Sequence, residues 1–362
     1  MNQALEHNIV SVSGGKDSTA LLLLAIERET PNLQAVFADT GHEHQLTYDY
    51  VSYLEQATGV PIRRVKADFT AQIAKKRTYV TEKWPGKLMA NHAGYWKWCG
   101  APEEMPAKDP SGLFAPMDEC VAAQVGDWFW RPAKIGMSAE QAQGIVARAL
   151  RVLEPTGNPF LDLCIWKGRF PSTKARFCSE ELKKKPMINQ VQKPLLDAGH
   201  DVISWQGVRA DESPSRALLN EMDCITQRNG TELWNYRPIL KWTVDDVFAM
   251  HRKHGIKPNP LYEQGMGRVG CMPCIHCRKD ELLEISKRFP QELERVAEWE
   301  RIVAQASKLG LPSFFATADG RGNNITEAVE WSKTSRGGQQ YDLIRTDRES
   351  MPLCSSIYGL CE

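Results

Sequence analysis

The feature that most constrains this chain is the string Asn8 to Ser18, which reads NIVSVSGGKDS and is followed by TALLLLAIER. Ile9, Val10 and Val12 predict a strand, the serine and two glycines after them break it, and an apolar helical pattern begins at once. Adjacent glycines let backbone N–H groups approach a ligand closely, and a helix N-terminus favours an anion. The stretch therefore predicts a phosphate-binding turn between a strand and a helix.

The side chains of this turn suit a bound phosphate. Lys16 adds a mobile positive charge, and Asp17 is placed to hold Mg²⁺ or a hydroxyl group at the rim. The other common phosphate loop, G-x-x-x-x-G-K-[ST], is excluded because it would need glycine at Val10 and a hydroxyl residue at Asp17. The predicted nucleotide-binding residues of the turn are Ser13, Gly14, Gly15, Lys16, Asp17 and Ser18.

Strands and helices alternate after the turn. Leu33 to Ala38 and Pro61 to Lys66 predict a second and a third strand, and His42 to Ala57 predicts a helix between them. This alternation is typical of right-handed βαβ crossovers and a parallel sheet. Further strands are predicted at 160–166, 201–208 and 234–240, the last of them as an edge strand.

Ligands of parallel sheets lie at the carboxyl ends of the strands. Asp39 ends the second predicted strand, so we expect it to contact a base or a ribose; capping of the next helix is the alternative. Arg209 and Arg216 lie in the octapeptide RADESPSR after the strand at 201–208. Because arginine forks suit phosphate or sulfate oxygens, we predict an anion-binding role for both, with a solvated salt-bridge loop as the alternative.

The pattern loosens between residues 83 and 159, where glycine, proline and tryptophan are frequent. We expect an insertion there that covers the active-site face or recognises the substrate, with one helix from Ser138 to Leu153. Its tryptophans suit either stacking on a nucleobase or, more commonly, the packing of a small core. The four concerned are Trp96, Trp98, Trp128 and Trp130.

The composition limits location and partners. The chain has 45 basic and 45 acidic residues, so no global field draws it to nucleic acid or membrane. Lys183 to Lys185 form only a short basic patch, and nucleic acid stays open as an acceptor. No apolar run approaches the roughly 18 residues that span a bilayer, and the first residues lack a basic and apolar leader, so we expect a cytoplasmic protein with no membrane partner.

The ten cysteines are therefore expected to be reduced thiols, metal ligands or catalytic groups. Cys271, Cys274 and Cys277 form a C-x₂-C-x₂-C sequence, in which thiolates can turn toward one centre and nearby N–H groups can support their charge. The spacing predicts a metal site with a fourth ligand from elsewhere. A four-cysteine site suits Zn²⁺ or a [4Fe–4S] cluster, and the spacing does not decide between them.

Cys178 is our predicted fourth ligand. Its helix, capped by Ser172 or Thr173 and stopped by Pro186, should pack beside the ligand edge of the sheet. The other candidates are His276, Cys354 and Cys361.

Six motifs in order resemble the phosphoadenosine phosphosulfate (PAPS) reductase family of the adenine-nucleotide α-hydrolase-like superfamily. They are SGGKDS at 13–18, ADTGHE at 38–43, RFCSEELK at 176–183, GVRADESPSR at 207–216, RPILKWTVDDV at 237–247, and NPLY with RVGCMPC at 259–274. The resemblance implies an α/β, Rossmann-like, parallel five-stranded sheet with helices on both faces and a nucleotide at its carboxyl edge, with Gly207 in the nucleotide site.

The same resemblance divides the chain into three parts. Residues 1–82 and 160–267 form the nucleotide-binding core, 83–159 the insertion, and 268–362 a helical, cysteine-rich C-terminal region.

The family includes both reductases and ATP pyrophosphatases, and departures from the reductases favour the second group. The chain ends YGLCE where assimilatory PAPS reductases carry a Glu-Cys-Gly-Leu-His-like tail, and Phe177 precedes Cys178 where iron–sulfur adenylyl-sulfate reductases have paired cysteines. Lys16, Asp17 and Ser18 match the ATP-cleaving members better, and the cysteine set resembles iron–sulfur sulfurtransferase-like members.

The resemblance thus implies an ATP pyrophosphatase that adenylylates an acceptor for sulfur transfer, including transfer to nucleic acid. It would use ATP with Mg²⁺, a [4Fe–4S] cluster or alternatively Zn²⁺, and a cysteine desulfurase or other sulfur donor. The residues expected to be catalytic are Lys16, Asp17, Arg209 and Arg216.

Two other functions stay open. One is a thiol-dependent reductase of adenylyl sulfate, with Cys361 as the nucleophile. The other is a non-catalytic nucleotide-binding subunit that uses its cysteines structurally.

Overall fold

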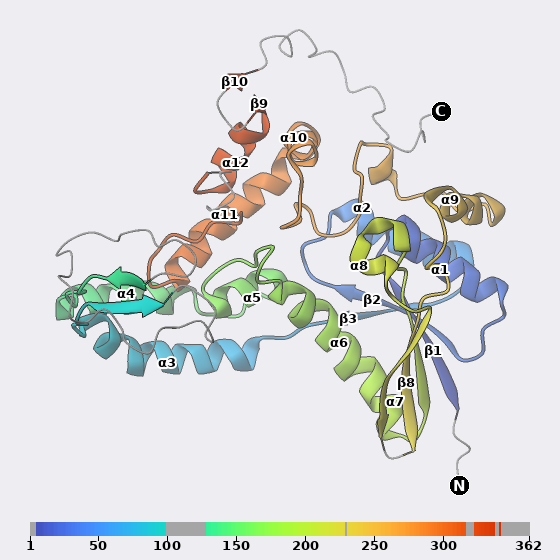
Figure 1. Ribbon diagram of the computed structural model, residues 1–362, viewed down its shortest axis with the longest axis horizontal. Helices are drawn as coiled ribbons and strands as arrows, with labels where there is room; N and C mark the ends of the chain where they lie inside the picture. The colour runs from blue at the N-terminus through green and yellow to red at the C-terminus, as the bar shows by residue number, and fades with distance from the viewer. Residues whose placement is uncertain (1–4, 99–127, 229, 316–321, 337–339, 342–362) are drawn as a thin grey trace. The chain divides into compact units, whose positions relative to one another are not determined.

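The computed structural model describes residues 5–98, 128–228, 230–315, 322–336 and 340–341 (Figure 1). The chain divides into two compact units, which are Met1–Ala71 with Pro155–Glu362, and Gln72–Glu154. Cys354 and Cys361, proposed above as a ligand or a nucleophile, lie outside the described residues. None of the helices in the described ranges combines the length and the apolar character required to cross a membrane.

The first unit is built on a six-stranded sheet with the strand order β3-β2-β1-β6-β8-β7. All neighbouring strands are parallel except β7 and β8, which are antiparallel. The strands are β1 (Glu6–Val12), β2 (Leu33–Asp39), β3 (Ile62–Lys66), β6 (Asp201–Trp205), β7 (Met222–Arg228) and β8 (Thr231–Tyr236).

The prediction of a five-stranded, wholly parallel sheet is therefore wrong at one edge, where a sixth strand, β7, pairs antiparallel with β8. Strand β7 was not predicted, and the strand expected at 234–240 lies earlier in the chain and inside the sheet. Only two residues separate β7 from β8, so the two strands must pair antiparallel as a hairpin. The sequence signal is the dipeptide Asn-Gly at 229–230, which favours such turns.

Helices cover both faces of the sheet, as predicted, because successive residues of each strand point to opposite sides. Val10, Phe37 and Trp205 face a core that includes apolar side chains of α1 (Lys16–Glu27), α2 (Gln45–Thr58) and α9 (Val244–Lys253). Ile9, Val36 and Val202 face a second core with Leu195 and Leu196 of α7 (Lys193–Asp197). Both faces are buried, which explains the apolar runs of the strands.

The helix that carries Cys178 differs from its prediction at both ends. Ser172 accepts a hydrogen bond from the N–H of Ala175 in a separate turn, and helical residues begin only at 177. Pro186 does not stop the helix. Two π-helical segments, Ser179–Lys184 and Ile188–Gln192, alternate with α6 (Lys185–Met187) and α7 (Lys193–Asp197). Proline has no backbone N–H to donate, and the change from i→i+4 to i→i+5 hydrogen bonds lets the helix continue past it.

The strand predicted at 160–166 is a helix, α5 (Pro159–Lys167). Asn158 caps its N-terminus by accepting from the N–H of Leu161, and Gly168 ends it with a φ of +67°. Nearly all of the apolar run between these ends is buried. A short segment that is apolar on every side shows no helical period, so only its caps reveal the helix.

A group of helices follows the cysteine motif, in agreement with the prediction of a helical C-terminal region. The helices are α10 (Lys279–Arg288), α11 (Pro290–Ala306) and α12 (Ile325–Ser332), after which β9 (Thr334–Arg336) pairs with β10 (Gln340–Tyr341). Helix α11 packs against α5 and brings Trp299 onto the ring of His42, which also meets Phe160 and Phe314. An aromatic cluster therefore joins these helices to the chain after β2.

The described residues of the second unit form two helices and a two-stranded ribbon. They are α3 (Thr70–Met89), β4 (Tyr95–Trp98), β5 (Trp128–Arg131) and α4 (Ala139–Val152). The helix predicted from Ser138 to Leu153 is confirmed as α4, and a capping box between Ser138 and Gln141 fixes its start.

Candidate functional site

The glycine turn joins β1 to α1 in the predicted way. Gly14 has a φ of +74°, a left-handed conformation that favours glycine, and a Cβ there would lie 2.8 Å from Cγ2 of Thr47. Gly15 is the N-cap residue, and helix α1 begins at Lys16. The first N–H groups of a helix have no intrahelical acceptor, so this end of α1 is suited to an anion.

The two serines of the turn stabilise its shape. The Ser18 Oγ accepts hydrogen bonds from the N–H and the hydroxyl of Ser13, both at 3.0 Å, and donates to the carbonyl of Gly15 at 3.0 Å. These hydroxyl groups thus hold the backbone of the turn in place, and contact of Ser13 and Ser18 with a nucleotide stays a prediction.

A chain of charges runs along one side of the turn. Asp17 lies 3.2 Å from the Nζ of Lys16 and 2.6 Å from the Nε of Arg209, whose Nη1 donates to Asp211 at 2.6 Å. The side chains of Lys16 and Arg209 are only 8% and 4% exposed. Burial lowers the pKa of Arg209, but the charge and hydrogen bond of Asp17 together with the charges of Asp211 and Glu212 more than offset this and raise it. The guanidinium therefore stays charged.

The loop after β6 reaches the turn at Gly207. A Cβ at this position would lie 3.3 Å from the backbone of Asp17 and of Ser18, so a small residue permits the close approach. Arg216 lies in the short helix α8 (Pro214–Ala217), is 43% exposed and pairs with Glu212. The structure thus brings Arg209 to the glycine turn, whereas the ion pair of Arg216 lies within its own loop.

Asp39 has structural partners at the end of β2. Its Oδ1 accepts hydrogen bonds from the N–H of Gly41 at 2.9 Å and from the hydroxyl of Tyr48 at 2.8 Å. The cap of α2 is His44 and not Asp39. The carboxylate of Asp39 therefore fixes the turn before α2, and contact with a ribose stays a prediction.

Three buried residues that support the turn were not predicted. The hydroxyl of Tyr262 accepts from the N–H of Lys16 at 2.9 Å, Asn259 donates to the carbonyl of Gly14 at 3.1 Å, and Nε2 of His251 lies 2.9 Å from the carbonyl of Lys16. Burial lowers the pKa of His251, so the neutral ring is favoured. The NPLY motif at 259–262 is the sequence signal for two of these contacts, because a buried asparagine side chain needs a hydrogen-bond partner.

The cysteine loop attaches to the chain after β2. Cys271 forms an isolated β-bridge with Glu43, and its Sγ lies 3.6 Å from the Oγ1 of Thr40. The N–H of Met272 donates to the carbonyl of His42 at 2.9 Å. Burial raises the pKa of the Cys271 thiol to about 12. The loop therefore lies at the carboxyl edge of the sheet, where the glycine turn also lies.

The other cysteines of the predicted set differ in their surroundings. Cys274 accepts from the Nη2 of Arg268 at 3.0 Å and from the N–H of His276 at 3.5 Å. Burial, and then the interaction with Cys274, raise the pKa of Cys178, and its role as the fourth ligand stays a prediction. Cys277 is fully buried and donates to the carbonyl of Arg278 at 3.5 Å.

Lys183, from the same helix as Cys178, also interacts with this loop. Interaction with Cys271, and to a smaller extent with Glu43, raises the pKa of Lys183. Within the described ranges, no three histidine, cysteine, aspartate or glutamate side chains are grouped so that they could hold a metal ion. The metal ligands therefore stay a prediction.

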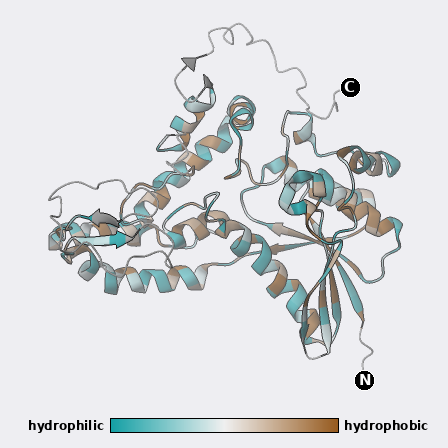
Figure 2. Ribbon diagram, viewed as in Figure 1, coloured by the Kyte–Doolittle hydropathy of each residue, from teal (hydrophilic) through white to brown (hydrophobic). Residues whose placement is uncertain are grey.

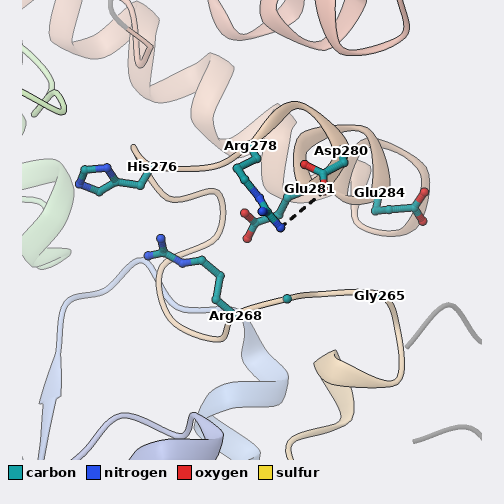
Figure 3. Close-up of a pocket in the computed structure, with 8 residues that line it drawn as sticks. Gly265, Arg268, His276, Arg278, Asp280, Glu281 and Glu284 are labelled. Carbon is teal, nitrogen blue, oxygen red and sulfur yellow. Dashed lines mark ion pairs between the residues drawn. The ribbon is translucent and has the colours of Figure 1, made fainter. Parts of the chain in front are cut away.

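A pocket of about 420 Å³ lies beside the cysteine loop (Figure 3). Arg268 and Glu281 point toward each other across it, and Arg278 forms an ion pair with Asp280 at 3.6 Å. His276, one of the candidate fourth ligands, lines this pocket.

A mostly parallel α/β sheet, with a glycine turn after its first strand and charged loops at its carboxyl edge, defines a nucleotide-binding protein. The chain belongs to the family of the phosphoadenosine phosphosulfate reductase domain, whose model matches residues 7–277. The predicted family is thereby confirmed, and an adenine nucleotide is the partner that this family supports. The matched range includes both the glycine turn and the cysteine motif.

Three known proteins show the range of similarity. An uncharacterized 37.8 kDa protein of Escherichia phage 186 is 48% identical and covers 98% of this chain and 96% of its own length. The adenosine 5′-phosphosulfate reductase of Burkholderia cepacia is 34% identical over 26% of this chain and 38% of its own. The crystal structure of PAPS reductase from Candida auris, a phosphate complex, is 13% identical with a TM-score of 0.36 and covers 75% of this chain and 82% of that one.

Proposed function

We propose that the protein is an ATP pyrophosphatase that adenylylates an acceptor for sulfur transfer. The observation that carries the proposal is the buried charge chain Lys16–Asp17–Arg209 beside the glycine turn. Lys16 and Arg209 present two cations next to helix N–H groups, with Asp17 and Asp211 as their carboxylate partners, and such a set of donors suits a polyphosphate.

The reaction balances as a displacement at the α-phosphorus of ATP. An oxygen of the acceptor forms a bond to this phosphorus, the bond to the bridging oxygen breaks, and the electron pair leaves with pyrophosphate. The N–H groups of the turn and Lys16 would stabilise the leaving pyrophosphate, and Arg209 would hold nucleotide or acceptor oxygens. Asp17 would help to place Mg²⁺, which neutralises the developing charge. Arg216, on the same loop as Arg209, would reach the acceptor.

ATP labelled separately at the α- and γ-phosphates tests which bond is cleaved. The proposal expects pyrophosphate together with AMP or an adenylylated acceptor. Release of inorganic phosphate and ADP would contradict it, and so would ATP binding without turnover in the presence of candidate acceptors, because that is the behaviour of a non-catalytic subunit.

A second candidate is the reduction of an adenylyl sulfate, favoured by the identity with the Burkholderia cepacia reductase. The thiolate of Cys361 would attack the sulfate sulfur, the nucleotide would leave, and an added thiol would then release sulfite as a disulfide forms. Sulfite production that Cys361→Ser abolishes would support this function. No sulfite from either adenylyl sulfate would remove it.

The cysteine motif is proposed to hold a [4Fe–4S] cluster, or Zn²⁺ alternatively, through Cys178, Cys271, Cys274 and Cys277. The donor chemistry fits, because all four are thiols, and Arg268 and an N–H group already donate to the Cys274 sulfur. A bound cluster would supply a sulfur-binding or electron-transfer centre, and a cysteine desulfurase or similar donor would supply the sulfur.

Metal and acid-labile sulfide analysis of protein purified without oxygen tests the cluster. We expect iron and sulfide at about four each, lost in Cys274→Ser and kept in the exposed control Cys224→Ser. Zinc alone would make the cysteines a structural site.

A further inference from the structure

A strongly cationic segment of the first unit runs from the end of α5 to the start of α6. Residues 167–185 contain seven lysines and arginines against two glutamates, whereas the whole chain has 45 basic and 45 acidic residues. The structure describes every residue of this segment. Figure 2 shows that α5 is mainly hydrophobic and that the helix after it carries hydrophilic residues. The positive charge therefore begins where the buried helix ends.

The carboxylates of the segment neutralise only part of its charge. Its two glutamates, Glu180 and Glu181, form ion pairs at 2.7 to 3.4 Å with Lys167, Lys184 and Lys185. A fourth lysine, Lys183, interacts with Cys271 and Glu43. The three other cations form no ion pair with any residue that the structure describes, and they are Arg169, Lys174 and Arg176. These three charges are therefore available to a partner.

The same three cations belong to one closed loop, residues 169–177, which we call the cationic loop. The guanidinium carbon of Arg169 lies 5.5 Å from the ring centroid of Phe177, so the two ends of the loop meet. At the tip, Ser172 and Ala175 exchange backbone hydrogen bonds at 3.2 and 3.1 Å, and the Ser172 Oγ accepts from the N–H of Ala175 at 3.1 Å. The loop is closed at both ends, so its cations are held in one small region.

Apolar residues anchor the cationic loop to the fold. Phe170 is 5% exposed, and its ring centroid lies 5.5 Å from that of Phe314, in the aromatic cluster described above. Pro171, the next residue, is buried as well. The three unpaired cations of the loop are all exposed. The loop is thus fixed on its apolar side and presents its charge to solvent.

We propose that the cationic loop binds the phosphodiester backbone of a nucleic-acid acceptor. Arginine forks and a lysine suit phosphate oxygens, and a loop that is already ordered loses little entropy when it binds. Cys178, a predicted metal ligand, follows the loop directly in the chain, so the loop is joined to the region expected to handle sulfur. Among the described residues, no exposed large apolar side chain lies within 167–185, and a lipid surface would require one.

This inference rests on the proposed function, since it names the class of acceptor, but binding is measured without ATP cleavage. Fluorescence anisotropy with labelled 20-nucleotide single strands of DNA and RNA, and with a 20-base-pair DNA duplex, measures binding to the full chain. We expect binding to at least one of these probes, with an affinity that falls as salt rises. The comparison of the three probes shows which form of the backbone is preferred.

The test variant is Lys174→Ala/Arg176→Ala, which removes two exposed cations of the loop. We expect binding to weaken about tenfold or more. On a single strand, the slope of log affinity against log salt should flatten by about 1.4, because each phosphate contact contributes about 0.7.

The control variant Lys184→Ala/Lys185→Ala removes the same charge from the same segment, but from lysines that are already paired with glutamates. It should weaken binding by less than about threefold, since these charges are neutralised in the free protein. Circular dichroism and thermal unfolding verify that both variants fold.

Equal weakening in the two variants would overturn the proposal, because it would show only a general charge effect. Absence of binding to all three probes at low salt would overturn it too, as would displacement of the oligonucleotide by an equal charge of polyglutamate or binding to anionic lipid vesicles alone. A failure of the proposed function would differ, since the wild type would bind the strand but release no pyrophosphate from ATP.

Discussion

The glycine turn and the cysteine loop lie at the same edge of one sheet but are built in different ways. The serine hydroxyl bonds and the Lys16–Asp17 ion pair of the turn join residues within six positions of each other. The cysteine loop depends on partners from other parts of the chain, namely Thr40, His42 and Glu43 from the chain after β2 and Arg295 from α11.

This difference explains what each region can tolerate. The serine bonds of the turn are local and form whenever β1 and α1 are in place, and Asn259, His251 and Tyr262 add hydrogen bonds from other parts of the first unit. The cysteine loop requires the aromatic cluster and the C-terminal helices, so its geometry follows the stability of the whole unit. Substitutions in the turn should therefore lower activity with little change in the free energy of unfolding. Substitutions in the cysteine loop should lower both.

Among substitutions that test the difference between the glycine turn and the cysteine loop, we expect the largest loss of activity for Arg209→Ala. The substitution leaves Asp17 without its closest cation and removes a buried guanidinium from the anion site. We expect a loss of about 3 kcal/mol in unfolding free energy and a fall in pyrophosphate release of roughly 100-fold. The matched control is Arg237→Ala, which also removes a buried arginine paired to a carboxylate. A similar fall in activity in the control would contradict the assigned role.

Gly14→Ala tests the geometry of the turn with an intermediate effect. Alanine would be strained at a φ of +74° and would meet Thr47, whereas Gly59→Ala has the same strain at +69° with open space around it. Each should lose about 1 kcal/mol or more, measured by urea unfolding, because L residues disfavour this conformation. Only Gly14→Ala should also lower pyrophosphate release, about tenfold; equal activity in the two variants would refute the close fit.

A smaller effect is expected in the cysteine region, where acid should destabilise the fold through His42. Burial, and then the charge of Arg295, lower its pKa well below the usual value, so protons bind more readily to the unfolded chain. The stability that the neutral ring confers is present above the unfolded pKa of about 6.5 and is lost as the pH falls below it.

Thermal unfolding measured from pH 7.5 to 5 tests this prediction. The melting temperature of the wild type should fall with pH, and the fall should be smaller in His42→Gln. An unchanged pH profile in that variant would show that other groups carry the effect.

The sequence was most informative where structure depends on neighbouring residues. The first strand, the glycine turn, the capping boxes of α4 and α9, and the helices after the cysteine motif all follow from local patterns. The misread segments needed tertiary information. Helix α5 is buried on all sides, and the helix through Pro186 continues by a change of hydrogen-bond register.

In the candidate site, too, residues fixed by local sequence could be predicted, and residues brought together by the fold could not. Lys16 and Asp17 could be predicted because their motif fixes them in one turn. Tyr262, Asn259 and His251 are separated from the turn by more than two hundred residues, so only the fold shows that they hydrogen bond to it. Cys178 was predicted to join the loop from the expected position of its helix, and that role stays a prediction.

The most direct test of the central claim is pyrophosphate release from Mg·ATP by the wild type, Lys16→Ala and the exposed-lysine control Lys257→Ala, with single-stranded DNA or RNA as acceptor. The account predicts release by the wild type and the control, and a fall of roughly 100-fold or more in Lys16→Ala. Equal release by the wild type and Lys16→Ala, above that without enzyme, would contradict the claim that the glycine turn and its buried lysine cleave ATP.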